Sequence, residues 1–293
     1  MSDSPFPVYR LDQWTTLRLQ LLWAYERHMG EATSPLAAGS YSFQTALLIK
    51  EGWAEAGDSR ASLKRVEAGQ WLVLRQGRRV QRFGQDCVLL SVGFRFQLPT
   101  GEAVFDQGFP LRIRDADYPA LQRTARRVLK EMRYHVGEGF FLRKQSLDMK
   151  HYLLSQNALR LFLIELAGVF HAEGLRPQLL RQQHPRVSEA LEIIDNALAS
   201  SGAPPKAADI ARRAGLSMTH LDRLMVAGTG HTVHQFVDAR RVCLAQDALL
   251  AGGSTLKAIA YNLGFSSPSH FNSWFRQRQG ETPLRYRNRN LDT

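Results

Sequence analysis

The fold of this chain is decided by two similar stretches near its C-terminus, PPKAADIARRAGLSMTHLDRLMVAGTGHT (204–232) and STLKAIAYNLGFSSPSHFNSWFRQRQGET (254–282). Each stretch predicts a short helix, a sharp turn and a second helix. The copies are offset by 49 residues before the turn, where Ala211 aligns with Ala260, and by 50 residues after it. One residue is therefore inserted in the second turn, at Ser266-Ser267, and both helical registers are kept.

Small residues define both turns. Each first helix is expected to end before a glycine, Gly215 or Gly264, because glycine adopts the left-handed backbone that a sharp helix exit requires. A serine then caps the next helix, Ser217 in the first copy and Ser267 in the second, where Pro268 takes the first helical position. Apolar side chains at i, i+3 and i+4 predict one buried face in each second helix; they are Leu221, Leu224 and Met225, and Phe271, Trp274 and Phe275.

The two copies together resemble the DNA-binding domain of the AraC/XylS family of bacterial transcription regulators. HQFVDARRVCLAQDALL (234–250) supplies the long helix that joins the two units in that family, and GETPLRYR (280–287) matches the family's characteristic ending. The resemblance covers residues 185–289. It implies an AraC-type domain over 184–293, with helix-turn-helix units at about 206–227 and 255–278. It also implies double-stranded DNA and RNA polymerase as partners, and activation more often than repression.

Positions off the buried faces are the candidates for DNA contact. In the family, the positions that match Thr219, Asp222 and Arg223 approach base edges, and Arg223 can grip guanine through two hydrogen bonds. The predicted base contacts of the second recognition helix are Ser269, His270, Asn272 and Ser273. The predicted contacts to the DNA backbone are Ser217, Ser267, Arg276, Arg278 and Arg285.

Composition agrees with a polyanionic partner. The 293 residues include 38 Lys and Arg against 27 Asp and Glu, which gives a net charge of +11. Such a balance suits nucleic acid. From His184 onward the net charge is only +4, so charge alone does not locate the DNA-binding end.

The N-terminal part has a β pattern. Short β-rich runs separated by glycine and proline extend from Tyr41 to about Phe109 and predict an antiparallel barrel or sandwich. The stretch GQWLVL (69–74) resembles the Gly-containing strand of the cupin-like sensor barrels that many AraC-family proteins carry. Residues 17–29 alternate as a strand does, although a helix is also compatible. The expected fold class is α+β and multidomain, with an antiparallel cupin-like barrel over 1–115.

Helices are expected at 118–135 and at about 142–173, within a helical linker or dimerisation segment over 116–175. The second helix has an apolar surface broader than one core stripe needs. Two interpretations stay open for it, a homodimer interface and packing against the barrel. Residues 174–186 resemble an interdomain linker.

No catalytic site is predicted. Cupin-type metal catalysis needs clustered His and carboxylate ligands, and residues 41–109 contain no histidine. Cys87 and Cys243 lie in different predicted domains without paired spacing, so neither a disulfide nor a zinc site is indicated. We expect no cofactor and no metal, and we expect a cytoplasmic protein without a membrane segment because the N-terminus lacks a signal pattern.

The sequence therefore predicts a one-component regulator in which the barrel senses a small molecule and the C-terminal domain binds promoter DNA. The candidate effector contacts are the aromatic residues Trp53, Trp71, Phe94 and Phe96, for which plain core packing is the alternative. Two other functions remain open: a ligand-independent architectural DNA-binding protein, and a cupin-type enzyme fused to a DNA-binding domain.

Overall fold

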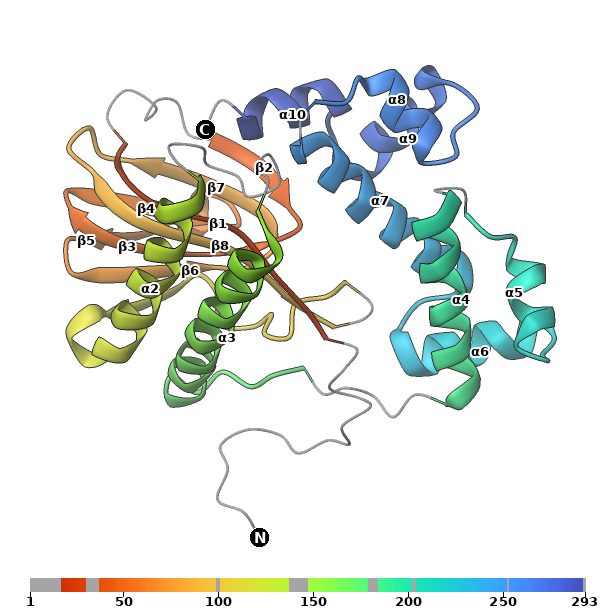
Figure 1. Ribbon diagram of the computed structural model, residues 1–293, viewed down its shortest axis with the longest axis horizontal. Helices are drawn as coiled ribbons and strands as arrows, with labels where there is room; N and C mark the ends of the chain where they lie inside the picture. The colour runs from red at the N-terminus through yellow and green to blue at the C-terminus, as the bar shows by residue number, and fades with distance from the viewer. Residues whose placement is uncertain are drawn as a thin grey trace, which may run out of the picture. The chain divides into compact units, whose positions relative to one another are not determined.

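The computed structural model describes residues 17–29, 37–98, 101–136, 147–178, 184–201, 204–251 and 253–291. The chain forms two compact units, Met1–Leu179 and Leu180–Thr293. The first unit contains the strands and two long helices, and the second is built from helices (Figure 1).

The described strands of the first unit form two antiparallel sheets. The larger sheet has the order β1 (Arg18–His28), β8 (Val88–Gln97), β3 (Gln44–Glu51), β6 (Gln70–Leu74), β9 (Leu111–Arg114). The smaller sheet has the order β2 (Ala37–Tyr41), β7 (Gly77–Phe83), β4 (Trp53–Gly57), β5 (Lys64–Glu67). The expected antiparallel architecture is confirmed, and residues 18–28 form a strand. Within the described residues the two sheets do not close into a single barrel.

The core between the sheets follows from strand alternation. Every second side chain of a strand points to the same face. These inward residues form one buried cluster; its members include Leu47 and Ile49 of β3, Leu72 and Leu74 of β6, Ala54 and Ala56 of β4, and Val66 of β5.

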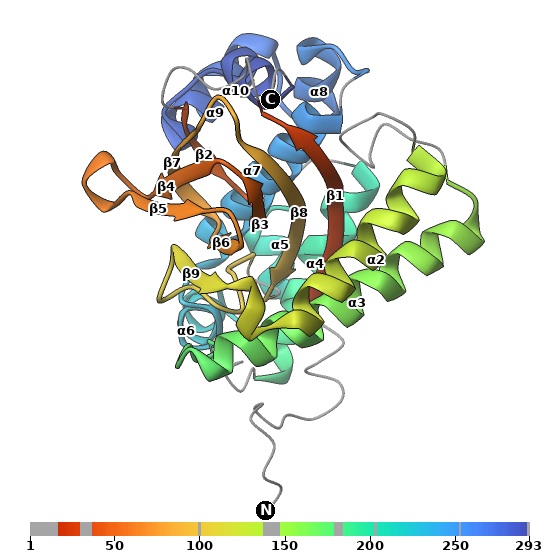
Figure 2. The same cartoon turned by 90° about the vertical axis from the view of Figure 1, so that its left-hand side faces the viewer.

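Two helices cover the other face of the five-stranded sheet. Helices α2 (Pro119–Val136) and α3 (Met149–Ala172) lie side by side next to β1 (Figure 2). Phe162 of α3 meets Phe94 of β8 with ring centroids 5.8 Å apart. Both faces of β8 are therefore buried, which explains why its sequence reads as a nearly continuous apolar run. Part of the helix predicted from residue 142 lies outside the described residues.

Helix α3 is apolar around most of its circumference. Among the described residues it is long and apolar enough to cross a membrane by length and composition, with a mean hydropathy of 1.4. Its buried side packs inside the first unit, as Leu159, Phe162 and Leu166 show. This arrangement is that of a core helix, with an additional exposed apolar side that includes Met149, Leu153 and Ile164.

The second unit is a bundle organised around one long helix. Its elements are α4 (Pro185–Ser201), α5 (Ala207–Arg213), α6 (Met218–Thr229), α7 (Val233–Ala251), α8 (Leu256–Asn262), α9 (Pro268–Gln279) and α10 (Pro283–Leu291). Helix α7 contacts α6 near one end and α8 and α10 near the other.

Helix α4 was not among the expected elements, and it begins inside the predicted linker 174–186. It supplies much of the first core, where Val187, Leu191 and Ile194 pack against Ile210 of α5 and Phe236 of α7. These α4 positions recur with helical spacing, so the periodic pattern was present in the sequence.

Candidate nucleic-acid interface

The two helix-turn-helix units share the same turn. Gly215 and Gly264 both take the left-handed backbone, with φ of 66° and 74°. The residue after each glycine donates its backbone N–H back to an alanine carbonyl, Leu216 to Ala211 at 2.9 Å and Phe265 to Ala260 at 3.0 Å. The predicted helix ends are confirmed, and the extra residue of the second copy lies in the turn.

Serine caps start both recognition helices, as predicted. Ser217 Oγ accepts the backbone N–H of His220 at 3.3 Å, and Ser267 Oγ accepts that of His270 at 3.2 Å. The two hydroxyls thereby fix the first turn of α6 and α9. Each helix ends at a left-handed glycine, Gly230 or Gly280.

The outward faces of α6 and α9 carry polar side chains. Thr219 and Arg223 of α6 are exposed, and Arg223 makes no hydrogen bond or ion pair with any described residue. On α9 the exposed residues include all four predicted base contacts and Arg276; the four are Ser269, His270, Asn272 and Ser273. The ring of His270 lies against that of Phe265, at 5.4 Å between centroids.

Sequence reasoning missed Val226 as a candidate contact. Val226 lies one turn after Arg223 and is 43% exposed. An exposed apolar side chain on a recognition helix can meet the methyl group of thymine. The sequence alone could have identified Val226, because it is an apolar residue outside the buried i, i+3, i+4 stripe.

Asp222 has a role inside the domain. Its Oδ1 accepts the backbone N–H of Val233 at 2.9 Å, which caps the start of α7, and the residue is half-buried. The equivalent position in the second unit is Asn272, and the residue equivalent to Val233 is Pro283, which has no N–H to be capped. Asn272 is exposed, so the two units use this position differently.

A groove lies on the surface of the first unit, among β1, β8, α3 and the loop before β9. It has a volume of about 350 Å³. Among the described residues, Arg160 brings the only charged side chain to the lining; the other lining residues are Leu17, Leu19, Phe96, Val104, Phe105, Leu163, Ile164, Ala167 and Pro177. Arg160 is exposed and makes no hydrogen bond or ion pair with the described residues.

The four aromatic effector candidates occupy different places. Phe96 lines the groove. Phe94 and Trp71 are core residues, and the indole N–H of Trp71 donates to Asp115 at 2.7 Å. Trp53 packs against the guanidinium of Arg65, 4.3 Å from the ring centroid. The structure therefore brings one of the four to the groove.

Neither cysteine takes part in a disulfide, and Cys87 is buried. Within the described ranges, no group of three or more His, Cys, Asp or Glu side chains is placed to hold a metal ion.

The second unit is similar in sequence to helix-turn-helix domains of known proteins. The helix-turn-helix domain family matches residues 210–289. The chain is 35% identical over 111 residues to the HTH-type transcriptional regulator GlxA of Rhizobium meliloti, and 33% identical over 82 residues to the HTH-type transcriptional regulator ExsA of Pseudomonas aeruginosa. The C-terminal domain is of the AraC type. The matched segments span 36% and 28% of this chain, and only 32% of GlxA and 30% of ExsA.

The likeness to ToxT of Vibrio cholerae extends over both units. A crystal structure of ToxT described as bound to an unsaturated fatty acid covers 94% of this chain and 96% of its own, with a TM-score of 0.52 and 11% identity. At this identity the likeness concerns the fold. It is a fold with an N-terminal sheet domain and a C-terminal helical domain of the helix-turn-helix type.

A cation–aromatic cluster holds the second helix-turn-helix unit of the AraC-type domain to α7. Arg241 of α7 lies over Phe265 and Trp274, at 4.1 and 5.2 Å from the ring centroids. Nε and Nη2 of Arg278 in α9 both donate hydrogen bonds to Oδ2 of Asp238 in α7, and the guanidinium lies over the ring of Trp274. Arg278, a predicted DNA-backbone contact, therefore already has an ion-pair partner within the domain, and its contact with DNA stays a prediction.

A partly buried ion pair joins α4 to α7 within the AraC-type domain. Nε and Nη2 of Arg240 both donate to Oδ1 of Asp195 on α4, at 2.9 and 2.8 Å. Only 9% of the Arg240 side chain is exposed. Sequence reasoning missed this pair, because its partners are separated by 45 residues and one of them lies on the unpredicted helix.

Proposed function

We propose that this protein is a transcription regulator that binds double-stranded DNA through α6 and α9. The observation that carries the proposal is the repeated unit: two recognition helices with the same caps and turns, each with an exposed polar face. Helix-turn-helix proteins place such a helix in the major groove. Two helix-turn-helix units joined by α7 could bind two adjacent segments of the major groove. Activation through RNA polymerase, which the AraC resemblance implies, is part of this proposal.

We assign the proposed contacts by exposure and by existing bonds. Base reading falls to Thr219 and Arg223 of α6 and to the exposed residues Ser269, His270, Asn272 and Ser273 of α9. Arg276 and Arg285 are exposed cations suited to phosphate. Ser217 and Ser267 lie at helix N-termini, where backbone N–H groups favour anions. Asp222 and Arg278 serve as positioning residues, because each is already bound within the domain.

The DNA-binding proposal predicts a footprint with two protected segments. We expect the full-length protein to protect major-groove segments about 10 base pairs apart, one helical turn. Affinity should fall steeply with salt, because each phosphate contact releases counterions. Hydroxyl-radical footprinting and a salt titration on selected operators would measure both. An absence of DNA binding even at about 50 mM salt would refute the proposal.

We further propose that the groove binds a small-molecule effector with a long apolar body and a carboxylate. The groove has the volume of ordinary ligand sites, which span about 300–1,000 Å³. Its apolar walls would cover a hydrocarbon chain, and Arg160 would meet the negative head. A fatty acid has this chemistry, and the ToxT structure of the same fold is described as bound to one.

One wall of the groove belongs to the segment that follows α3 toward the DNA-binding unit. Pro177 lines the groove, and the backbone N–H of Gln178 donates to the carbonyl of Val104, a lining residue, at 2.7 Å. Leu175 packs close to Gly108 of the same loop. A ligand in the groove would therefore contact both the loop and this segment. This arrangement gives the proposed effector a physical route to influence the chain that leads into the AraC-type domain.

The Arg160→Gln variant tests the effector proposal. A fatty acid such as oleate should raise the melting temperature of the full-length protein, because a ligand of the folded state stabilises it. Oleyl alcohol should bind more weakly. We expect Arg160→Gln to weaken oleate binding by about tenfold, the lower end of the range for a charged hydrogen bond, and to leave oleyl alcohol unchanged.

Two variants complete this test. Lys150→Gln removes an exposed cation of the same helix outside the groove and should leave oleate affinity unchanged. Ile164→Glu places a charge in the lining at a site that is 59% exposed, and should abolish binding of both ligands. Equal oleate affinity in the wild type, Arg160→Gln and Ile164→Glu would place the site elsewhere. If oleate left the melting temperature of the wild type unchanged, DNA binding would stand as that of a ligand-independent protein.

A further inference from the structure

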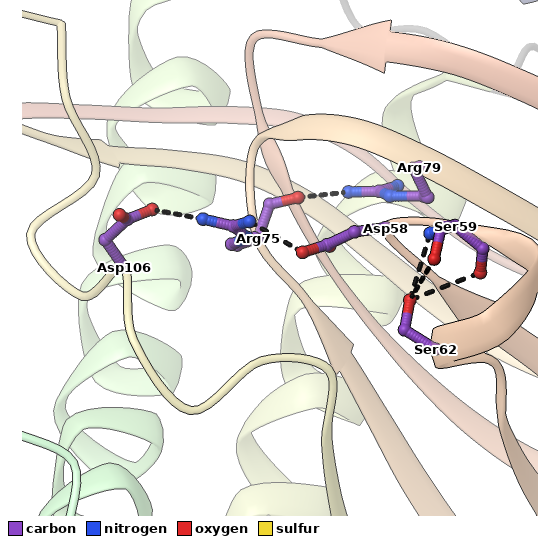
Figure 3. Close-up of polar contacts among 6 residues, drawn as sticks. All are labelled: Asp58, Ser59, Ser62, Arg75, Arg79 and Asp106. Carbon is purple, nitrogen blue, oxygen red and sulfur yellow. Dashed lines mark hydrogen bonds and ion pairs between the residues drawn. The ribbon is translucent and has the colours of Figure 1, made fainter.

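A second group of charged residues surrounds the turn between β6 and β7. Arg75 binds two carboxylates from different loops, with Nη2 2.7 Å from Oδ2 of Asp58 and Nη1 3.2 Å from Oδ1 of Asp106 (Figure 3). Lys64 lies nearby and donates its Nζ hydrogen to the carbonyl of Pro110 at 2.7 Å. Three chain segments thus meet at this end of the sandwich.

Arg79 is buried beside this group, and no carboxylate forms an ion pair with it among the described residues. Its guanidinium donates to neutral acceptors: Nη1 to Oγ1 of Thr45 at 3.0 Å, and Nη2 to the carbonyls of Arg75 at 2.9 Å and Phe43 at 3.4 Å. It also lies over the rings of Tyr41 and Phe43, 4.7 and 5.7 Å from their centroids. Its Nε is buried without any hydrogen-bond partner. Burial lowers the pKa of Arg79 to about 10, so the side chain is still charged near neutral pH. A buried charge of this kind is costly unless it is paired.

Three arginines line one small cavity here. Arg75, Arg78 and Arg79 all contribute to it, together with Asp58, Phe109 and Pro110. The cavity has a volume of about 10 Å³, which is room for one water and too little for an oxyanion unless the cavity opens. Arg78 is exposed and forms no ion pair with the described residues. Counting Lys64, the group holds four cations and two carboxylates, so positive charge is left over.

We propose that this cavity is the binding site of a small oxyanion, a carboxylate or a phosphate, whose place on Arg75 is held in this structure by Asp58. The Asp58 and Arg75 side chains are 40% and 33% exposed, and an ion pair at this exposure contributes little to stability. Asp58 lies in a short loop whose other polar contacts are local, from Ser59 to Ser62. Outward movement of that loop would enlarge the cavity and bring the oxyanion to Arg75, Arg78 and the unsatisfied Nε of Arg79.

The Nε–H group of Arg79 can report binding directly by NMR. We would titrate ¹⁵N-labelled full-length protein with sodium phosphate and with sodium acetate, holding ionic strength constant with sodium chloride. We expect a saturable shift of the Arg79 Nε–H signal. The anion that saturates at the lower concentration identifies the preferred chemistry, phosphate or carboxylate.

Substitutions at Asp58, whose side chain is partly exposed, and at the exposed residue Arg78 test the proposal without disturbing the fold. Asp58→Asn removes the competing carboxylate and should tighten binding about threefold, the size expected of one partly exposed ion pair. Arg78→Gln removes a cation and should weaken it by a similar factor. Arg223→Ala, on α6, should change nothing, which separates this site from phosphate bound at the proposed DNA surface. The proposal is overturned if the signal does not saturate with either anion, or if Asp58→Asn and Arg78→Gln bind as the wild type does.

Discussion

The Phe275→Ala variant is expected to lose about 3–5 kcal/mol of unfolding free energy, the cost of removing a fully buried phenylalanine. Phe275 of α9 is fully buried, and its ring lies 5.8 Å from that of Phe271 and 5.4 Å from that of Tyr286. The second helix-turn-helix unit is small, so this loss is a large share of its stability. Thermal unfolding followed by circular dichroism would measure the effect. DNA footprinting should show loss of the segment that α9 protects.

The matched control for this variant is Gln277→Ala on the same helix. Gln277 is exposed, and surface substitutions of this kind change stability by no more than about 0.5 kcal/mol. If Phe275→Ala lowered stability as little as the control does, the aromatic cluster would not be what holds α9 to the domain.

The helix-turn-helix units could be predicted from the sequence because the interactions that define them are local. A cap such as Ser217 or Ser267 binds an N–H three residues away, and a glycine at the turn acts within one residue. The buried stripes of α6 and α9 repeat at helical spacing. Interactions of this range depend on a short window of sequence, and the structure confirms them, with Leu224 of the α6 stripe only partly buried.

Only the outline of the N-terminal unit, Met1–Leu179, could be predicted from the sequence. Alternating apolar runs indicated antiparallel strands, but they did not show that two helices cover the larger sheet. Trp71 and Phe94 could therefore be taken for effector contacts, although both are core residues. The groove depends on residues from Leu17 to Pro177, which lie far apart in the sequence. Arg160, the one cation that the described part of the chain brings to the groove, belongs to no sequence motif.

Asp222 makes a tertiary contact that its position in the recognition helix does not predict. Position within the recognition helix indicates a base contact, which stays a prediction, and the structure shows in addition that Asp222 caps Val233, 11 residues away. The presence of Pro283 at the equivalent place in the second unit was visible in the sequence. Because Pro283 has no N–H, Asn272 cannot repeat in the second unit the bond that Asp222 makes in the first.

Arg223→Ala is expected to flatten sequence preference at one base pair of the operator. Arg223 is exposed in the middle of α6. The alternative role of pairing with a helix neighbour such as Thr219 is not observed, because Arg223 makes no hydrogen bond to a described residue. Its guanidinium is therefore available for two hydrogen bonds to guanine, a contact worth about 1–3 kcal/mol of discrimination. Binding to a library of single-base operator variants would measure the loss.

Arg276→Ala provides the contrast, because Arg276 is an exposed cation of α9 one turn beyond Asn272. If it meets a phosphate, its removal weakens all operator variants about equally and lowers the slope of log affinity against log salt by roughly one. Arg223→Ala should lower that slope far less, since a base contact releases no condensed counterion. Base preference and salt dependence, measured for both variants, thus distinguish an arginine that reads a base from one that binds a phosphate. If Arg223→Ala lowers every operator variant alike and changes the salt slope as Arg276→Ala does, then Arg223 holds a phosphate, and base reading by α6 falls to Thr219 and the exposed Val226.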